Sequence, residues 1–178
     1  EMIKQAEQTE GFKLLNGNIS STDLGCTFDA VISLFHVISY QTTNDMVLST
    51  FSNASKHLSR DGYFIFDVWY SPAVYKQEPT IRVKYFKDKN FNLTRIAEPK
   101  IYQEENRVDV HYKIFAENLI SGELYKFEES HPMRHFSLLE IDLLAKFTGF
   151  ERVSAEEFLT GKSPSEQTWG VCFIFKKV

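Results

Sequence analysis

Cysteine is scarce in this chain of 178 residues: only Cys26 and Cys172 occur, far apart and with no C-x-x-C spacing. This argues against a cysteine-ligated metal site. Both residues flank or occupy apolar segments, so we expect two small buried thiols. Free thiols are typical of a reducing compartment, which makes the cytoplasm the simplest location.

An excess of positive charge and long hydrophobic runs are also lacking. The net charge of −4 and the pI near 5.8 argue against a protein that binds nucleic acid by neutralising phosphates. No apolar run approaches the roughly 20 residues that span a bilayer. The first ten residues, EMIKQAEQTE, are polar and acidic, unlike a secretion signal or a transit peptide. We therefore expect neither a nucleic-acid nor a membrane partner.

The motifs of several enzyme classes are absent. No H-E-x-x-H, G-x-S-x-G or P-loop spacing occurs, so a zinc protease, a serine hydrolase and a P-loop NTPase lack support. Asp23-Leu24-Gly25-Cys26 opens like a glycine-rich cofactor turn, but it continues as Thr27-Phe28-Asp29. The residues of this stretch alone leave open whether it binds a cofactor or leads into another element.

Three nearly continuous apolar runs of strand length are present, at 28–35, 62–69 and 168–175. Such runs are typical of strands buried on both faces of an α/β sheet. A shorter strand is predicted at 13–15. The segment between the first two long runs has one apolar helical face, formed by Val47, Phe51, Ala54 and Leu58. Thr42 and Asp45 resemble a capping box at its start. This strand–helix–strand order predicts a crossover between parallel strands.

Residues 80–128 follow a different period, in which apolar and polar residues alternate. Alternation with one polar face predicts an antiparallel sheet. Helical spacing returns after Ser137, which forms a capping box with Glu140, and Gly149 marks the helix end. We predict an α/β core, residues 1–79 and 137–178, interrupted by an inserted antiparallel β meander at 80–136 that is too long for an ordinary loop.

Ligands of open parallel sheets bind beyond the carboxyl ends of the strands. That rule selects three segments, 17–20, 36–40 and 67–70. His36 either contacts a ligand or transfers a proton there, or it is hydrogen-bonded beneath a loop. Asp67 either faces a ligand or caps the following turn. The aromatic rings that follow it either form a substrate platform or pack in the core.

The densest polar cluster is the segment 129–136, which places two histidines and an arginine just before the capped helix. Arg134 either holds a carboxylate or phosphate through its bidentate fork or forms an ion pair with Glu128 or Glu129.

The order of these segments resembles a known family. The series GNI, FDAVISLFHVISY, a helix, HLSRDGYFIFDVWY and GFERV is similar to the class I S-adenosylmethionine-dependent methyltransferases over nearly the whole chain. FDVWYSPAV, the inserted meander and ESHPMRHFSLLEIDLLAKFTGF resemble, more narrowly, the aminosugar N-methyltransferases that act on nucleotide-linked sugars.

The resemblance implies a partial Rossmann-like methyltransferase sheet that lacks its first two strands. In that family a D-x-G-x-G-x-G turn follows the first strand, whereas Asp23-Leu24-Gly25-Cys26 corresponds to the linker before the fourth strand. Residues 1–8 match the helix after the second strand. The cofactor turn is then expected upstream of Glu1, and this chain alone is expected to be inactive.

The resemblance also implies roles for matched residues. The S-adenosylmethionine adenine would border Asn18, where the family usually has aspartate, and Ile19. The methionine end would be lined by Leu34, Phe35, His36 and Tyr40. On the meander side, the acceptor pocket would be lined by Trp69, Tyr70, His131, Arg134 and His135. His131 and His135 are the candidate catalytic bases, which a hydroxyl acceptor would need. No metal is required, because the sulfonium methyl group is already activated.

Two other readings stay open: a non-catalytic methyltransferase-like binding or partner subunit, and an unrelated α/β protein such as a sugar-nucleotide-binding module. A small-molecule acceptor is the expected partner of an enzyme. A free strand edge also invites pairing with a second copy, so a homodimer is a further expectation.

Overall fold

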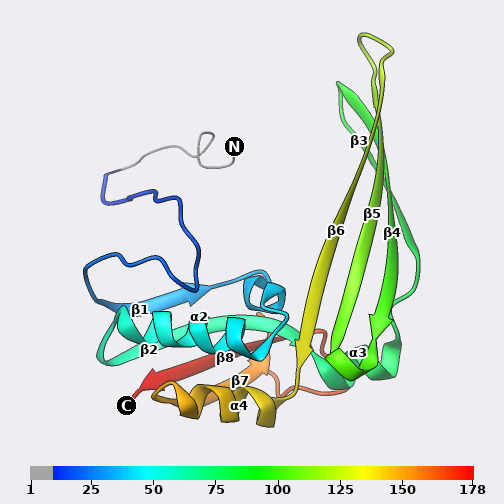
Figure 1. Ribbon diagram of the computed structural model, residues 1–178. Helices are drawn as coiled ribbons and strands as arrows, with labels where there is room; N and C mark the ends of the chain where they lie inside the picture. The colour runs from blue at the N-terminus through cyan, green and yellow to red at the C-terminus, as the bar shows by residue number, and fades with distance from the viewer. Residues whose placement is uncertain (1–9) are drawn as a thin grey trace.

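A parallel pair of strands, β1 (Phe28–Ser33) and β2 (Leu58–Tyr70), begins the core sheet in this computed structural model, which describes residues 10–178. Helix α2 (Asn44–Lys56) connects the two strands, so the predicted crossover is confirmed. β8 (Gly170–Lys177) runs antiparallel to β2, and β7 (Phe150–Glu157) runs antiparallel to β8. These elements form the core region in Figure 1.

Helix α2 begins one residue later than the sequence pattern suggests. Thr43 is its N-cap, and the Thr43 hydroxyl accepts a hydrogen bond from the Met46 N–H at 3.2 Å. Thr42 therefore forms no capping box. The helix ends at Lys56, so Leu58, predicted on the helical face, belongs to β2 and is buried there.

Stacked phenylalanines fill the space between α2 and the sheet. Phe51 of α2 lies 5.3 and 5.1 Å from the ring centroids of Phe64 and Phe66. Phe66 in turn stacks on Phe173 and Phe175 of β8, at 5.4 and 5.8 Å. All five side chains are essentially inaccessible to solvent. Burial of each stabilises the fold by roughly 1.5–3 kcal/mol.

Helix α4 (Leu138–Phe147) packs beside α2 on the same apolar cluster. The predicted capping box is confirmed, because the Ser137 hydroxyl accepts from the Glu140 N–H and the Glu140 carboxylate accepts from the Ser137 N–H. Gly149 follows the helix with φ of +81°, a conformation that favours glycine.

The remaining strands form a long antiparallel arm, defined here as residues 82–136. It contains β3 (Arg82–Lys87), β4 (Phe91–Tyr102), β5 (Arg107–Asn118) and β6 (Leu124–Phe136), each paired with the next. Two 3₁₀ turns, η1 (Val37–Tyr40) and η2 (Gln103–Glu105), and helix α3 (Ser71–Gln77) complete the described elements.

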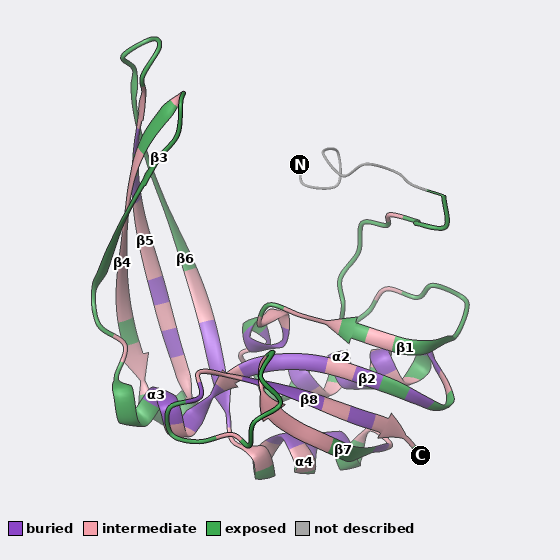
Figure 2. Cartoon of the chain, turned by 180° about the vertical axis from the view of Figure 1, so that it is seen from behind, coloured by how far each residue is buried: buried purple, intermediate pink, exposed green. Residues whose placement is uncertain are grey.

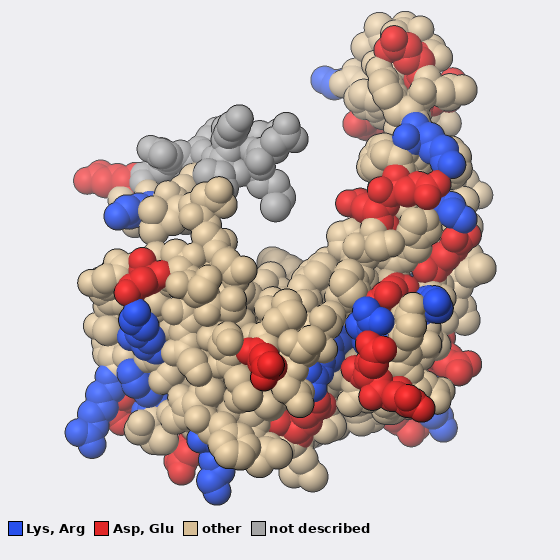
Figure 3. All heavy atoms as spheres, in the orientation of Figure 1, with Lys and Arg blue, Asp and Glu red and all other residues tan. Residues whose placement is uncertain are grey.

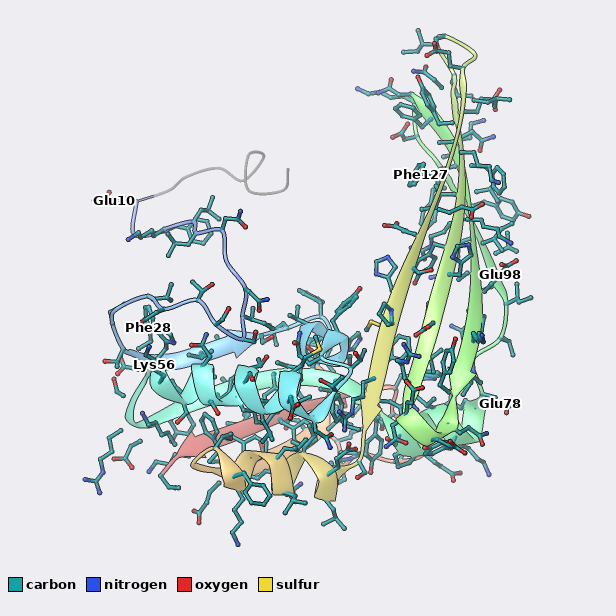
Figure 4. All side chains as sticks on the ribbon, in the orientation of Figure 1. Glu10, Phe28, Lys56, Glu78, Glu98 and Phe127 are labelled. Atoms are coloured by element: carbon teal, nitrogen blue, oxygen red, sulfur yellow. The ribbon has the colours of Figure 1, made fainter. Side chains whose placement is uncertain are left out.

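The arm and the core share one sheet. The last residues of β6 pair in parallel with β2, Trp69 opposite His135 and Tyr70 opposite Phe136, which gives the strand order β3-β4-β5-β6-β2-β8-β7. β1 pairs with the earlier part of β2, on the same edge as β6 and opposite β8. The arm then rises away from the core (Figure 1). Figure 4 shows Phe127 in the upper part of the arm, on β6, and Glu98 nearer the core, on β4. The α/β class with an antiparallel β meander is therefore confirmed.

Burial follows the distance from the core. Buried residues concentrate in the core and towards the base of the arm (Figure 2). The alternation in β5 gives the expected buried face, with Val108, Val110 and Ile114 less than a tenth exposed. All six residues of β3 are exposed, because β3 is the edge strand. Acidic and basic side chains alternate along the arm surface in Figure 3.

Some sequence predictions fail or lie outside the described residues. The predicted strand at 13–15 does not form. Cys172 is buried as expected, but Cys26 is exposed, because it lies in a loop before β1. The helix predicted for residues 1–8 lies outside the described part of the chain. Within residues 10–178, no helix has the length and apolarity to cross a bilayer.

Candidate functional site

The turn after β1 has an unusual backbone. Phe35 and His36 both adopt left-handed conformations, with φ of +64° and +62°. A left-handed conformation costs a residue other than glycine roughly 1–3 kcal/mol. Strain of this kind is often found at functional sites. The His36 N–H donates to both carboxylate oxygens of Asp67, at 3.2 Å each. This fixes the turn over the carboxyl end of β2.

The His36 side chain also meets Asp67. Nδ1 of His36 lies 2.7 Å from Oδ2 of Asp67, whose side chain is fully buried, while 32% of the His36 side chain is exposed. The ring lies edge-on to Trp69 at 6.3 Å. A Cβ atom on Gly170 would lie only 3.2 Å from Cε1 of His36, so the absence of a side chain at 170 lets the imidazole approach β8.

The arm presents a second imidazole to the same place. Nδ1 of His131 lies 2.7 Å from the Tyr40 hydroxyl, and Nε2 lies 3.5 Å from a carboxylate oxygen of Glu129. The rings of Tyr40 and Tyr112 pack edge-on against the imidazole, at 5.8 and 5.2 Å. Burial, and next to it the charges of Tyr112 and Glu129, raise the pKa of the Tyr40 phenol. Tyr40 therefore stays a neutral phenol.

Between the two imidazoles lies a cleft of about 370 Å³. Its size falls within the range of small-molecule sites. Arg95 contributes a guanidinium that lies 5.0 Å from the ring of Tyr112. Aromatic, apolar and charged side chains from both the core and the arm line the cleft: Phe35, His36, Tyr40, Trp69, Arg95, Val110, Tyr112, Ile114, Glu129, His131 and Met133.

A separate hollow of about 450 Å³ lies along the free side of β1 and is mostly apolar. Asn18 and Ile19 line it together with Ile32, Ser33 and Thr50. The hydroxyls of Ser33 and Thr50 are buried, and neither has a hydrogen-bond partner in the described part of the chain. Buried hydroxyls usually have hydrogen-bond partners, so two unpartnered hydroxyls beside one hollow are unusual.

The residues predicted from the sequence fall into three places. Phe35, His36, Tyr40, Trp69 and His131 meet in the cleft. Asn18 and Ile19 lie in the hollow instead, where the Asn18 side chain accepts hydrogen bonds from Ser20. Four predicted residues line neither space: Leu34, Tyr70, Arg134 and His135.

His135 is part of the interior. It is fully buried, its Nδ1 lies 2.8 Å from the Ser71 hydroxyl, and the Tyr75 ring packs edge-on against it. Burial, with a smaller contribution from Arg134, lowers the pKa of His135 to about 4. The structure therefore places this predicted base away from the cleft, as a neutral core histidine.

Tyr70 and Arg134 have structural contacts. Tyr70 is only 9% exposed and packs in the phenylalanine cluster. The Arg134 guanidinium donates to the Asn44 side chain at 2.7 Å and to the Glu140 carboxylate at 2.6 Å. An ion pair of Arg134 was one of the two expected roles, but the partner is Glu140 and not Glu128 or Glu129. Arg134, near the end of β6, reaches the starts of α2 and α4.

Sequence reasoning missed several cleft residues, notably Arg95, Tyr112 and Glu129. Tyr112 pairs with Glu129 across β5 and β6 and with Ala97 on β4. The alternation of the meander predicts that Tyr112 lies on the same face of β5 as Val110 and Ile114. The strand register decides which residues lie beside it, and no local pattern fixes that register.

Comparisons with known proteins identify the fold. No family model matches the chain. The putative methyltransferase YqeM of Bacillus subtilis (strain 168) is 29% identical over 153 residues, which cover 84% of this chain and 59% of that protein.

Solved structures show the same architecture. A S-adenosylmethionine-dependent methyltransferase from Clostridium acetobutylicum superposes with a TM-score of 0.79 at 18% identity, covering 93% of this chain and 64% of that one. DesVI of Streptomyces venezuelae gives 0.73 at 15%, with 91% and 64% covered. CalS10, an amino pentose methyltransferase from Micromonospora echinaspora, gives 0.70 at 18%, with 91% and 63% covered. The chain thus spans about three fifths of the length of these proteins.

Proposed function

Since the chain has the fold of class I S-adenosylmethionine-dependent methyltransferases, we propose that it forms part of an enzyme that methylates a small molecule in the cleft between core and arm. The observation that carries this proposal is the convergence of His36, Tyr40 and His131 on one cleft of small-molecule size. His36 and Tyr40 come from the turn after β1 in the core, and His131 comes from β6 in the arm. Packing of the core does not require these three side chains to meet.

The hollow beside β1 fits the adenosyl part of S-adenosylmethionine. It is mostly apolar, and the unpartnered hydroxyls of Ser33 and Thr50 supply polar contacts. Asn18 adds an amide at its rim. When bound, S-adenosylmethionine supplies a methyl group attached to a positively charged sulfur, a good leaving group. The residues of this chain then have to hold and orient the acceptor and keep water out.

The cleft suits an amine acceptor with a separate anionic group. The Glu129 carboxylate and the rings of Trp69 and Tyr112 favour a cation. Arg95, in the same lining, favours a phosphate or a carboxylate. We propose a nucleotide-linked aminosugar as the acceptor type. The likeness to CalS10, an amino pentose methyltransferase, supports the aminosugar part of this proposal.

Calorimetry on the protein that contains this chain tests the cofactor site. We expect S-adenosylhomocysteine to bind, and Thr50→Val to weaken binding by about 5- to 10-fold, the effect of one lost hydrogen bond. The same substitution should leave the free protein equally stable or more stable, because it removes an unpartnered buried hydroxyl. Thr27→Val, at an exposed position, is the control. Absence of binding would contradict the proposal. Binding without any methyl transfer would favour a non-catalytic partner subunit.

A further inference from the structure

The five histidines differ in what their ring nitrogens contact. Both nitrogens of His57 are engaged, since Nε2 accepts from the Leu24 N–H at 2.9 Å and Nδ1 lies 2.8 Å from the Asn53 carbonyl. His111, on the arm, has Nδ1 at 2.9 Å from the Ser130 hydroxyl and Nε2 at 3.3 Å from Glu128. Neither imidazole has a nitrogen free to react with a ligand.

The two histidines predicted as bases are also unsuited to that role. His131 has Tyr40 at one nitrogen and Glu129 near the other. His135 has an unpartnered Nε2, but the residue is fully buried and lines neither the cleft nor the hollow. A general base has to come within hydrogen-bond reach of the acceptor proton, which burial prevents.

His36 is different. Its Nδ1 lies 2.7 Å from Oδ2 of Asp67, as a close ion-pair contact outside hydrogen-bond geometry. Its Nε2 has no hydrogen bond or ion pair with another described residue. The ring lines the cleft and is one-third exposed. A carboxylate beside Nδ1 favours the tautomer that carries its hydrogen on Nδ1, which leaves the lone pair on Nε2.

Asp67 is suited to stabilise the protonated ring. Its side chain is fully buried, and a buried carboxylate needs an opposite charge or hydrogen-bond donors. The described donors to it are the backbone N–H of His36, with Nδ1 of the same residue in contact. A proton gained at Nε2 turns the imidazole into a cation next to this carboxylate.

The surrounding backbone holds the ring in this position. His36 adopts a left-handed conformation, and Gly170 leaves room that a Cβ atom would take from the imidazole. The left-handed backbone of His36 is strained, and such strain is often found at functional sites.

We propose that His36 is a catalytic residue that accepts the acceptor's proton at Nε2 and that Asp67 is its positioning residue. The proposal rests on the methyltransferase function proposed above. The N–H bond of an ammonium acceptor, or the O–H bond of a hydroxyl, breaks as the proton forms a new bond to Nε2. Its electron pair stays on the acceptor atom and becomes the nucleophilic lone pair. The imidazolium later releases the proton to water. His131 positions Tyr40 and takes no proton from the acceptor.

The first test reads the histidines directly and needs no acceptor. In ¹⁵N NMR spectra of the protein that contains this chain, neutral His36 should carry hydrogen on Nδ1 and none on Nε2. Diethyl pyrocarbonate, which reacts with unprotonated accessible imidazole, should modify His36 before His131 and leave His135 unmodified. Asp67→Asn should shift the His36 tautomer equilibrium. A His36 that carries hydrogen on Nε2, or reacts no faster than His131, overturns the proposal.

The second test measures S-adenosylhomocysteine formation, with an ultrafiltered metabolite extract of the source cells as the acceptor mixture. His36→Gln should lower kcat by about 100-fold, the usual effect of losing a general base, with unchanged S-adenosylhomocysteine affinity. His111→Gln, on the outer face of the arm, is the matched control and should keep the wild-type rate. An unchanged kcat in His36→Gln overturns the proposal and leaves the methyltransferase function intact. Lack of methyl transfer by the wild-type protein overturns both.

Discussion

The hydroxyl of Tyr40, at the end of η1, lies 2.7 Å from Nδ1 of His131 on β6, although the two residues are 91 positions apart. This contact joins the core to the arm directly at the cleft. Together with the short β2–β6 pairing, it sets where the arm stands relative to the turn that holds His36. The geometry of the cleft therefore depends on polar side chains as well as on the shared sheet.

Removal of the Tyr40 hydroxyl should loosen this junction. Tyr40→Phe keeps the aromatic contact and loses one partly exposed hydrogen bond, so unfolding free energy should fall by only about 0.5–1 kcal/mol. Methyl transfer should fall more than stability does, because the contact between Tyr40 and His131 sets the position of the arm at the cleft. Urea denaturation and S-adenosylhomocysteine formation measure the two effects. Tyr125→Phe, whose hydroxyl contacts Glu123 on the distal arm, is the control and should change neither.

The buried His135 predicts a dependence of stability on pH. Its pKa falls from 6.5 to about 4 in the folded protein, so the unfolded chain binds a proton that the folded protein excludes. Stability from this residue is complete above pH 6.5 and is lost as the pH falls towards 4. The expected loss is about 3 kcal/mol. His135→Gln should show a shallower decline between pH 7 and 5 in urea denaturation. Parallel curves for the two proteins would contradict a buried neutral imidazole.

The Arg134–Glu140 ion pair should contribute more to stability than a surface pair of similar length. Arg134→Met leaves the partly buried Glu140 carboxylate without its partner, and should cost about 2–3 kcal/mol. Lys113→Met breaks the exposed Lys113–Glu98 pair at 2.7 Å, and should cost less than about 1 kcal/mol. Equal losses in thermal or urea unfolding would show that burial does not distinguish the two pairs.

A substitution of Gly170 should change the position of the His36 ring more than the stability of β8. In Gly170→Ala the new Cβ would approach Cε1 of His36 to 3.2 Å, which displaces the imidazole from Asp67. Activity should fall, and NMR signals of His36 should shift. A double-mutant cycle with His36→Ala tests the cause, because the methyl group has room once the ring is removed. Additive effects of the two substitutions on stability would argue against the contact.

Local patterns account for the parts of the fold that the sequence predicted well. The Ser137–Glu140 capping box involves neighbouring residues, and the β1–α2–β2 crossover follows from three consecutive segments. Even there, the helix start moved from Thr42 to Thr43, since both residues can cap and only the backbone conformation decides between them.

The candidate site was harder to predict, because it depends on contacts between distant segments. His36 and Asp67 were each selected as strand-end residues, but their contact with each other was not foreseen. Asn18 and His36 were expected at two ends of one cofactor, and the structure places them beside two separate spaces, the hollow and the cleft. Glu129 lines the cleft because β6 pairs in register with β5, which places it opposite Tyr112.

Transfer of a deuterated methyl group is the most direct test of the proposed function. The protein that contains this chain is incubated with methyl-deuterated S-adenosylmethionine and an ultrafiltered metabolite extract, and the small molecules are analysed by mass spectrometry. We predict that one amine-bearing compound gains the deuterated methyl group, in a molar amount equal to the S-adenosylhomocysteine formed. Absence of any labelled small molecule, with the cofactor recovered unchanged, would contradict methyl transfer in this cleft.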